Sequence, residues 1–140
     1  MALLMVDQGE QILGELMVNK TTTSQDLVLR LFKNNYVPVD ASTEANFTEA
    51  DFTGYAAVTL TGASWTVTPN APTLCTYAQQ TFTCTVAPGS PMPIYGYYLT
   101  QFTSGKLMWA EVFTGGPYTI TYVGDLIKVT PNLNIKKAGE

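Results

Sequence analysis

The spacing of apolar residues predicts a helix close to the start of the chain. Asp7 and Glu10 have the spacing of a capping box, in which the first side chain accepts hydrogen bonds from free backbone N–H groups and the second reaches back. Four apolar residues then recur at intervals of three or four positions and share one helical face: Ile12, Leu13, Leu16 and Met17. The helix is expected to start after Asp7 and to end near Asn19.

Beyond this helix the pattern is typical of strands. In Leu27–Phe32 every second residue is Leu, which places the leucines on one face of a strand. The segment Phe47–Phe52 is expected to form a single helical turn with Thr48 as its cap. Short apolar segments separated by Gly, Pro, Asn or Ser then follow at 56–60, 64–69, 73–78, 81–86, 94–102, 106–113, 118–123 and 126–135. The expected fold is mainly β, an antiparallel sandwich or barrel-like sheet with a short N-terminal α-helix.

The length of 140 residues fits one domain, with residues 1–20 as a helical arm and 27–140 as the β-rich body. Charged residues make up 13% of the chain, about half the usual share, and the net charge is −4. Seven basic residues in an acidic chain disfavour a phosphate-binding surface, so we expect no direct contact with nucleic acid. No apolar run approaches the length of a membrane span, so we expect no membrane contact either.

The stretch Thr73–Val86 predicts a β-hairpin whose turn is centred on Gln79-Gln80. This register places Cys75 opposite Cys84 on the same face of the hairpin. The two cysteines could form a cross-strand disulfide or remain small apolar thiols, and a cytosolic site of synthesis favours the thiols. Both states of the pair stay open at this point.

The aromatic-rich stretch Ile94–Phe113 predicts a second hairpin, with a two-residue turn at Ser104-Gly105 that pairs Thr100 with Trp109. Apolar side chains fall on both faces of this hairpin. A sugar-binding platform would gather its rings on one exposed face, so the distribution favours a core or a subunit interface instead. The candidate contact residues here are Tyr95, Tyr97, Tyr98 and Trp109.

Few residues of the chain suit catalysis. There is no His, which removes the commonest general base and metal ligand, and the two cysteines lack the spacing of a zinc site. A carboxylate pair such as Glu111 and Asp125 could serve glycoside hydrolysis. The favoured interpretation is that Glu111 is a hydrogen-bonded strand residue and Asp125 a turn former. We therefore expect no catalytic residue, no metal, no cofactor and no enzymatic activity.

Several stretches of the chain resemble a group of small virion proteins from tailed bacteriophages. "LRLFKNNYVPVDASTEANFTEADFTGYA", from Leu29 to Ala56, is similar to the start of these proteins, where a strand leads through a loop to an "F-E-x-F-GYA" element. "IYGYYLT", "LMWAEVF" and "GDLIKVTPNLNI" look like later stretches of the same group. The resemblance covers about three-quarters of the chain, and the central stretch Thr73–Val86 has no counterpart in it.

This resemblance implies a structural part of the virion, most simply a capsid decoration or cement protein. Its expected partners are the major capsid protein and copies of itself, and its expected location is the capsid surface after synthesis in the bacterial cytoplasm. The predicted helix and the aromatic hairpin are the expected contact regions. Two alternatives remain: a tail, baseplate or receptor-binding module that binds host glycan, and a glycan-active enzyme that uses Glu111.

Overall fold

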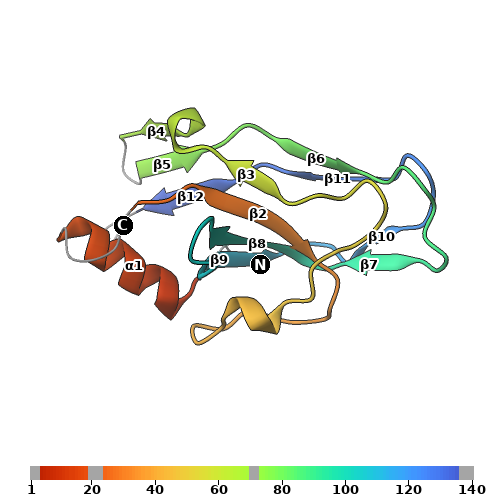
Figure 1. The fold of residues 1–140 in the computed structure, drawn as a ribbon, viewed down its shortest axis with the longest axis horizontal. Helices are drawn as coiled ribbons and strands as arrows, with labels where there is room; N and C mark the ends of the chain where they lie inside the picture. Colours follow the sequence, from red (N-terminus) through yellow and green to blue (C-terminus); the bar gives the residue numbers. More distant parts are fainter. Residues whose placement is uncertain (1–3, 19–23, 70–72, 136–140) are drawn as a thin grey trace.

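The computed structural model of the chain describes residues 4–18, 24–69 and 73–135, and within these ranges it is mainly β, as predicted (Figure 1). The helix α1 spans Asp7–Met17, and two short 3-10 helices span Glu44–Asn46 and Gly62–Ser64. The strands are β1 (Leu4–Met5), β2 (Leu27–Phe32), β3 (Val58–Leu60), β4 (Thr66–Thr68), β5 (Thr73–Thr76), β6 (Gln80–Thr83), β7 (Met92–Ile94), β8 (Gly96–Gln101), β9 (Leu107–Val112), β10 (Tyr118–Ile120), β11 (Leu126–Val129) and β12 (Asn132–Ile135).

The main layer is a five-stranded antiparallel sheet with the order β1-β9-β8-β2-β3. Strand β8 lies in the middle, and each of its residues is buried. A strand that is apolar on both faces requires cover on both sides. The aromatic hairpin predicted from the sequence is therefore the centre of this fold.

The second layer is a long two-stranded ribbon with a short extra strand at one end. β5 and β6 follow each other along one side, and β11 and β12 follow each other along the other, with β4 added beside β5 (Figure 1). The N–H of Tyr77 donates to the carbonyl of Pro131 at 3.0 Å and links the two halves of the ribbon. The sheets do not close into a barrel, and the two layers pack as a sandwich.

This ribbon shows that the predicted hairpin with its turn at Gln79-Gln80 is wrong. β5 pairs with β12 and β4, while β6 pairs with β11, so Cys75 lies opposite Leu133 rather than Cys84. Glutamine has no preference for the positive φ angles that tight hairpin turns require, and the chain passes through this point without reversing. Both cysteines are free thiols, so the disulfide is absent and the alternative of two thiols holds.

The β8–β9 hairpin exists, but its register differs from the prediction by one residue at Leu99 and by two residues at Thr100. Trp109 lies opposite Leu99, and the register shifts between Leu99 and Thr100, so that Thr100 lies opposite Leu107. The connection is longer than two residues, since the N–H of Gln101 donates to the carbonyl of Lys106 at 2.9 Å. A one-residue shift in strand pairing turns side chains to the opposite face of the sheet. Trp109 therefore lies on the same face as Leu99.

Two apolar clusters cover the two faces of the main sheet. The larger lies between the layers and includes Leu29, Leu99 and Trp109 together with Phe82 and Ile127 from the ribbon. The smaller lies on the outer face and is completed by the start of the chain and by the loop that follows β2. Its buried members are Val6, Phe32, Phe47, Tyr98, Leu107 and Ala110.

Helix α1 packs at the β9 edge of the main sheet, but its start differs from the predicted capping box. The N-cap residue is Val6, whose side chain cannot accept a capping hydrogen bond, and Asp7 is the first helical residue. The N–H of Asp7 donates instead to the backbone carbonyl of Asp40 at 2.9 Å. Asp7 and Glu10 still place negative charge at the positive end of the helix, which favours it.

The helical turn predicted for Phe47–Phe52 is also wrong. The 3-10 helix lies just before it, and Thr43 together with Asn46 forms its capping box. The segment that follows runs beside the end of β2, where Glu49 forms a bridge with Phe32 and the N–H of Ala50 donates to the carbonyl of Leu31. Pairing with a free strand edge satisfies more backbone groups here than one isolated turn would.

Candidate functional site

The contact residues predicted on the aromatic hairpin are mostly enclosed within the chain itself. Trp109 is 4% exposed in the cluster between the layers, and Tyr97 is buried in the same cluster. Tyr98 is buried on the outer face, and Tyr95 is partly buried beside it. Three of the four side chains thus offer almost no surface to a partner, and their role is in the core.

The helix contributes mainly to the fold as well. Ile12 is buried in the core, while Leu13 and Leu16 are partly buried. Met17, at the end of the helix, is 79% exposed. Of the predicted helical contact residues, Met17 therefore has most of its side chain available to a partner.

Glu111 is a hydrogen-bonded strand residue. The hydroxyl of Tyr97 lies opposite on β8 and donates to Oε2 of Glu111 at 2.6 Å. Burial, followed by this hydrogen bond and the carboxylate charge, raises the pKa of Tyr97 far above its ordinary value, which keeps the hydroxyl protonated as the donor. The arrangement explains Glu111 as a polar contact at the edge of the core.

Asp125 shapes the turn between β10 and β11. Its Oδ2 accepts from the N–H groups of Thr121 and Tyr122, both at 2.7 Å. These two hydrogen bonds lower the pKa of the Asp125 carboxyl below its ordinary value of 3.8. The favoured interpretation of Asp125 as a turn former is confirmed.

A pH-dependent contribution to stability follows from this turn. Because the pKa of Asp125 is lower in the folded chain, its stabilising effect is complete above the ordinary value of 3.8 and is lost as the pH falls through the lowered value. We expect D125N to unfold more easily than the wild type near pH 7, with the difference shrinking below about pH 4. Urea unfolding of both proteins across this range would measure it, and a difference that does not change with pH would contradict the assignment.

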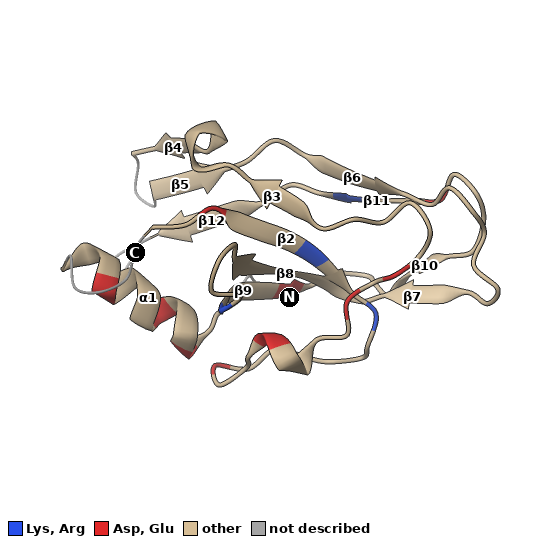
Figure 2. Ribbon diagram, viewed as in Figure 1, with Lys and Arg blue, Asp and Glu red and all other residues tan. Residues whose placement is uncertain are grey.

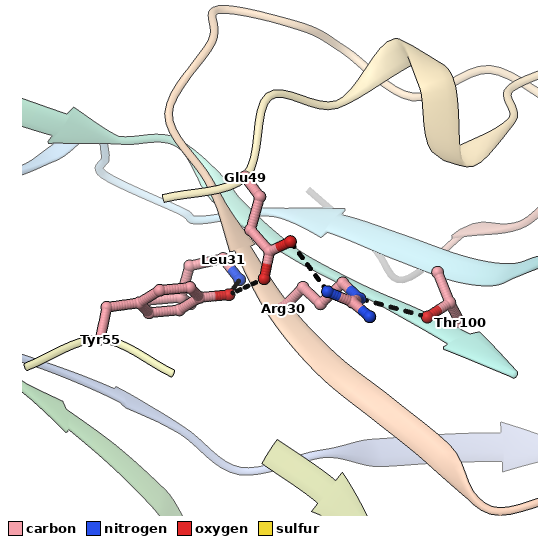
Figure 3. A network of polar contacts seen from close by, with 5 residues as sticks. All are labelled: Arg30, Leu31, Glu49, Tyr55 and Thr100. Atoms are coloured by element: carbon pink, nitrogen blue, oxygen red, sulfur yellow. Dashed lines mark hydrogen bonds and ion pairs between the residues drawn. The ribbon is translucent and has the colours of Figure 1, made fainter. Parts of the chain in front are cut away.

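A second polar network joins the loop after β2 to the main sheet (Figure 3). Nη1 of Arg30 donates to Oε2 of Glu49 at 2.8 Å, and Nε of Arg30 donates to Oγ1 of Thr100 at 3.3 Å. The Tyr55 hydroxyl donates to Oε1 of Glu49 at 2.7 Å and accepts from the N–H of Leu31 at 3.2 Å. Both oxygens of Glu49 are thus held in structural contacts.

A groove with a volume of about 540 Å³ lies between β10 and β11. Four large hydrophobic side chains in β10, β11 and the turn between these strands are exposed. Tyr122 is 70% exposed, and Tyr118, Val123 and Leu126 are also exposed. The residues that line the groove are Phe113, Thr114, Tyr118, Thr119, Ile120, Asp125, Leu126, Ile127 and Lys128. Groups of exposed apolar side chains mark sites of contact with other molecules.

The sequence patterns did not single out this groove. One signal was present, because Tyr122-Val123 places two large apolar residues immediately before the Gly124-Asp125 turn, where polar residues are usual. The groove itself arises from the divergence of β10, which pairs with β7, and β11, which pairs with β6.

Neither a metal-binding cluster nor a membrane-spanning helix is present in the part of the chain that the structure describes. No group of three or more His, Cys, Asp or Glu side chains in residues 4–18, 24–69 and 73–135 has an arrangement that could hold a metal ion. The described helices, α1 and the two 3-10 helices, are all too short to cross a membrane. Comparison of the chain with models of protein families, with curated proteins and with solved structures finds no match.

Proposed function

We propose that this chain is a structural virion protein, a capsid decoration or cement protein that binds the major capsid protein and neighbouring copies of itself on a phage head. The observation that carries the proposal is the β10–β11 groove, which the exposed Tyr118 and Leu126 line, together with the exposed Tyr122 and Val123 in the turn that joins its two strands. Tyrosine and large apolar side chains are typical of protein interfaces, and the two-layer core below holds them in place.

The resemblance to small virion proteins of tailed phages supports the same assignment. One of the resembling stretches, Gly124–Ile135, forms β11 and β12 and supplies one wall of the groove. The two candidate catalytic carboxylates are engaged in internal contacts, Glu111 with Tyr97 and Asp125 with two backbone N–H groups. These contacts favour a structural role over glycoside hydrolysis.

The alternative proposal is a tail, baseplate or receptor-binding module. Decoration of a head repeats each contact over many equivalent positions, so that modest individual affinities suffice. A tail module would occupy few positions and would need a stronger single contact. The two proposals therefore differ in the number of copies per particle.

The groove gives a direct test. In the double variant Tyr122→Ser and Leu126→Ser, two exposed apolar side chains are lost, and we expect binding to undecorated heads of the encoding phage to weaken at least about tenfold. Both positions are exposed, so the melting temperature should change little. Co-sedimentation of purified protein with the heads, over a range of protein concentrations, measures the binding.

Val67→Ser is the matched control, because Val67 is an exposed apolar residue on β4, away from the groove. It should bind as the wild type does. Equal binding of the double variant and the control would remove the groove from the proposed interface. Failure of the wild-type protein to bind heads would overturn the proposal of a decoration protein.

A further inference from the structure

The β10–β11 groove runs along the edges of two strands rather than over one face of a sheet. Side chains of a strand alternate between its two faces, so a groove on one face would be lined by every second residue. This groove is lined instead by consecutive residues, Tyr118–Ile120 of β10 and residues 125–128 at the start of β11. Among the described strands, β10 pairs only with β7 and β11 only with β6, so each has an open edge (Figure 1).

The open edge of β11 presents hydrogen-bonding groups of the backbone. In an antiparallel pair, every second residue directs its N–H and C=O groups to the partner strand, and the residues between direct theirs away from it. The N–H of Cys84 donates to the carbonyl of Asp125 at 2.8 Å, which sets this alternation for the β6–β11 pair. Leu126 and Lys128 are therefore the residues that face away from β6. Their outward N–H and C=O groups have no partner in the described parts of the chain.

Strand β10 has an edge of the same kind. Thr119 lies opposite Pro93 of β7, and proline has no N–H, so these two residues cannot exchange a pair of hydrogen bonds. The N–H and C=O of Thr119 consequently point away from β7, and no described residue bonds with them. Unpaired backbone groups along a strand edge are a template for one more strand. Strand β11 offers two outward residues and β10 one, so β11 is the longer template.

The side chains of the groove restrict which strand could be added. The buried Ile120 and Ile127 line it together with the partly buried Phe113, and apolar side chains of an added strand would contact them. Lys128 is the charged residue of these two strands, and it has no ion pair within the described ranges (Figure 2). The carboxylate of Asp125 is bonded instead to two N–H groups of its own turn. An acidic side chain on the added strand would pair with Lys128.

We propose that the β10–β11 groove binds an extended segment of the partner protein, which adds as a strand to the open edge of β11. The backbone of the segment pairs with Leu126 and Lys128, its apolar side chains enter the groove at alternate positions, and a carboxylate lies beside Lys128. In such strand addition the main-chain hydrogen bonds provide affinity, and the alternate side chains provide selectivity. The segment belongs to the major capsid protein, so this assignment rests on the proposed function.

The test is hydrogen–deuterium exchange of the full chain, free and bound to undecorated heads of the encoding phage, read by mass spectrometry after release. The amides of Leu126 and Lys128 should exchange quickly in the free protein and at least about tenfold more slowly on the heads. The amides of Ile127 and Val129 bond with β6 and should be protected in both states, which makes them the internal control.

A proline at position 128 tests the same pairing by mutation. The β6–β11 pair does not use the N–H of Lys128, so Lys128→Pro should keep that pair and the fold but cannot donate to an added strand. It should bind heads at least about tenfold more weakly in the co-sedimentation assay. Lys128→Gln is the matched control, because it loses the charge and keeps the N–H, and it should bind only about two- to threefold more weakly.

The possible outcomes separate this assignment from the proposed function. Binding to heads without protection of the Leu126 and Lys128 amides, or wild-type affinity of Lys128→Pro, would overturn the added strand and leave a decoration protein. Protection of the two amides that rises with the concentration of the free protein would also overturn it, and would assign the edge to a second copy of this chain. If the wild-type protein did not bind heads, both proposals would fall.

Discussion

Replacing Trp109 with alanine is expected to lower the free energy of unfolding by about 3–5 kcal/mol. Trp109 lies on β9 in the cluster between the layers, where it contacts the ring of Trp65 with centroids 6.4 Å apart. Removal of such a buried ring loses its transfer free energy and leaves a cavity that its neighbours fill only in part. Chemical denaturation monitored by far-ultraviolet circular dichroism would measure the change.

Trp109→Phe is the control for this experiment. Nε1 of Trp109 is buried without a hydrogen-bond partner among the described residues, so phenylalanine loses volume but also removes an unsatisfied donor. Its cost should be clearly smaller than that of alanine. If Trp109→Ala left stability unchanged, the ring would not be part of the core, and its role as a binding residue would return.

Gly96→Ala is expected to destabilise the chain by about 3 kcal/mol, because β8 has no space for a side chain at this position. A Cβ atom there would overlap the backbone carbonyl oxygen of Glu111 and would lie 2.7 Å from the ring of Phe32. Neither a backbone atom in the central sheet nor a buried ring can move freely. Thermal unfolding of the variant should show the loss as a lowered melting temperature.

Gly14→Ala is the opposite case and serves as the control. Gly14 lies in helix α1, and apart from its chain neighbours and the backbone of its own helix no atom lies within 4 Å of the position that its Cβ would take. Alanine should therefore raise stability by about 0.5–1 kcal/mol through its helix propensity. Similar losses in both variants would contradict the explanation by close backbone approach at Gly96.

The local sequence pattern predicted whether each long element is a helix or a strand, but it did not predict all of the strand pairings. The apolar spacing indicated helix α1, and the alternation in Leu27–Phe32 indicated β2, because both patterns reflect burial of one face. The two-sided apolar character of β8 correctly favoured a central position. Pairing depends on residues far apart in the chain, as in the β6–β11 ribbon, and no local signal specifies it.

The errors have particular physical causes. At Gln79-Gln80 the pattern of apolar residues suggested symmetry about a turn, although neither residue favours a turn conformation. In the β8–β9 hairpin, the register shift at Leu99 and Thr100 changed which side chains share a face. The groove at Tyr118 and Leu126 could not be predicted, because it forms only where two strands of different sheets diverge.

The most direct test of the proposed function is to locate and count this chain in purified particles of the phage that encodes it. A cryo-EM map should show the two-layer β-domain at symmetric positions on the head, with the β10–β11 groove against the major capsid protein. Quantitative mass spectrometry of the same particles should find many copies per head. Absence from the particles, or a few copies confined to the tail vertex, would contradict the proposal of a capsid decoration protein.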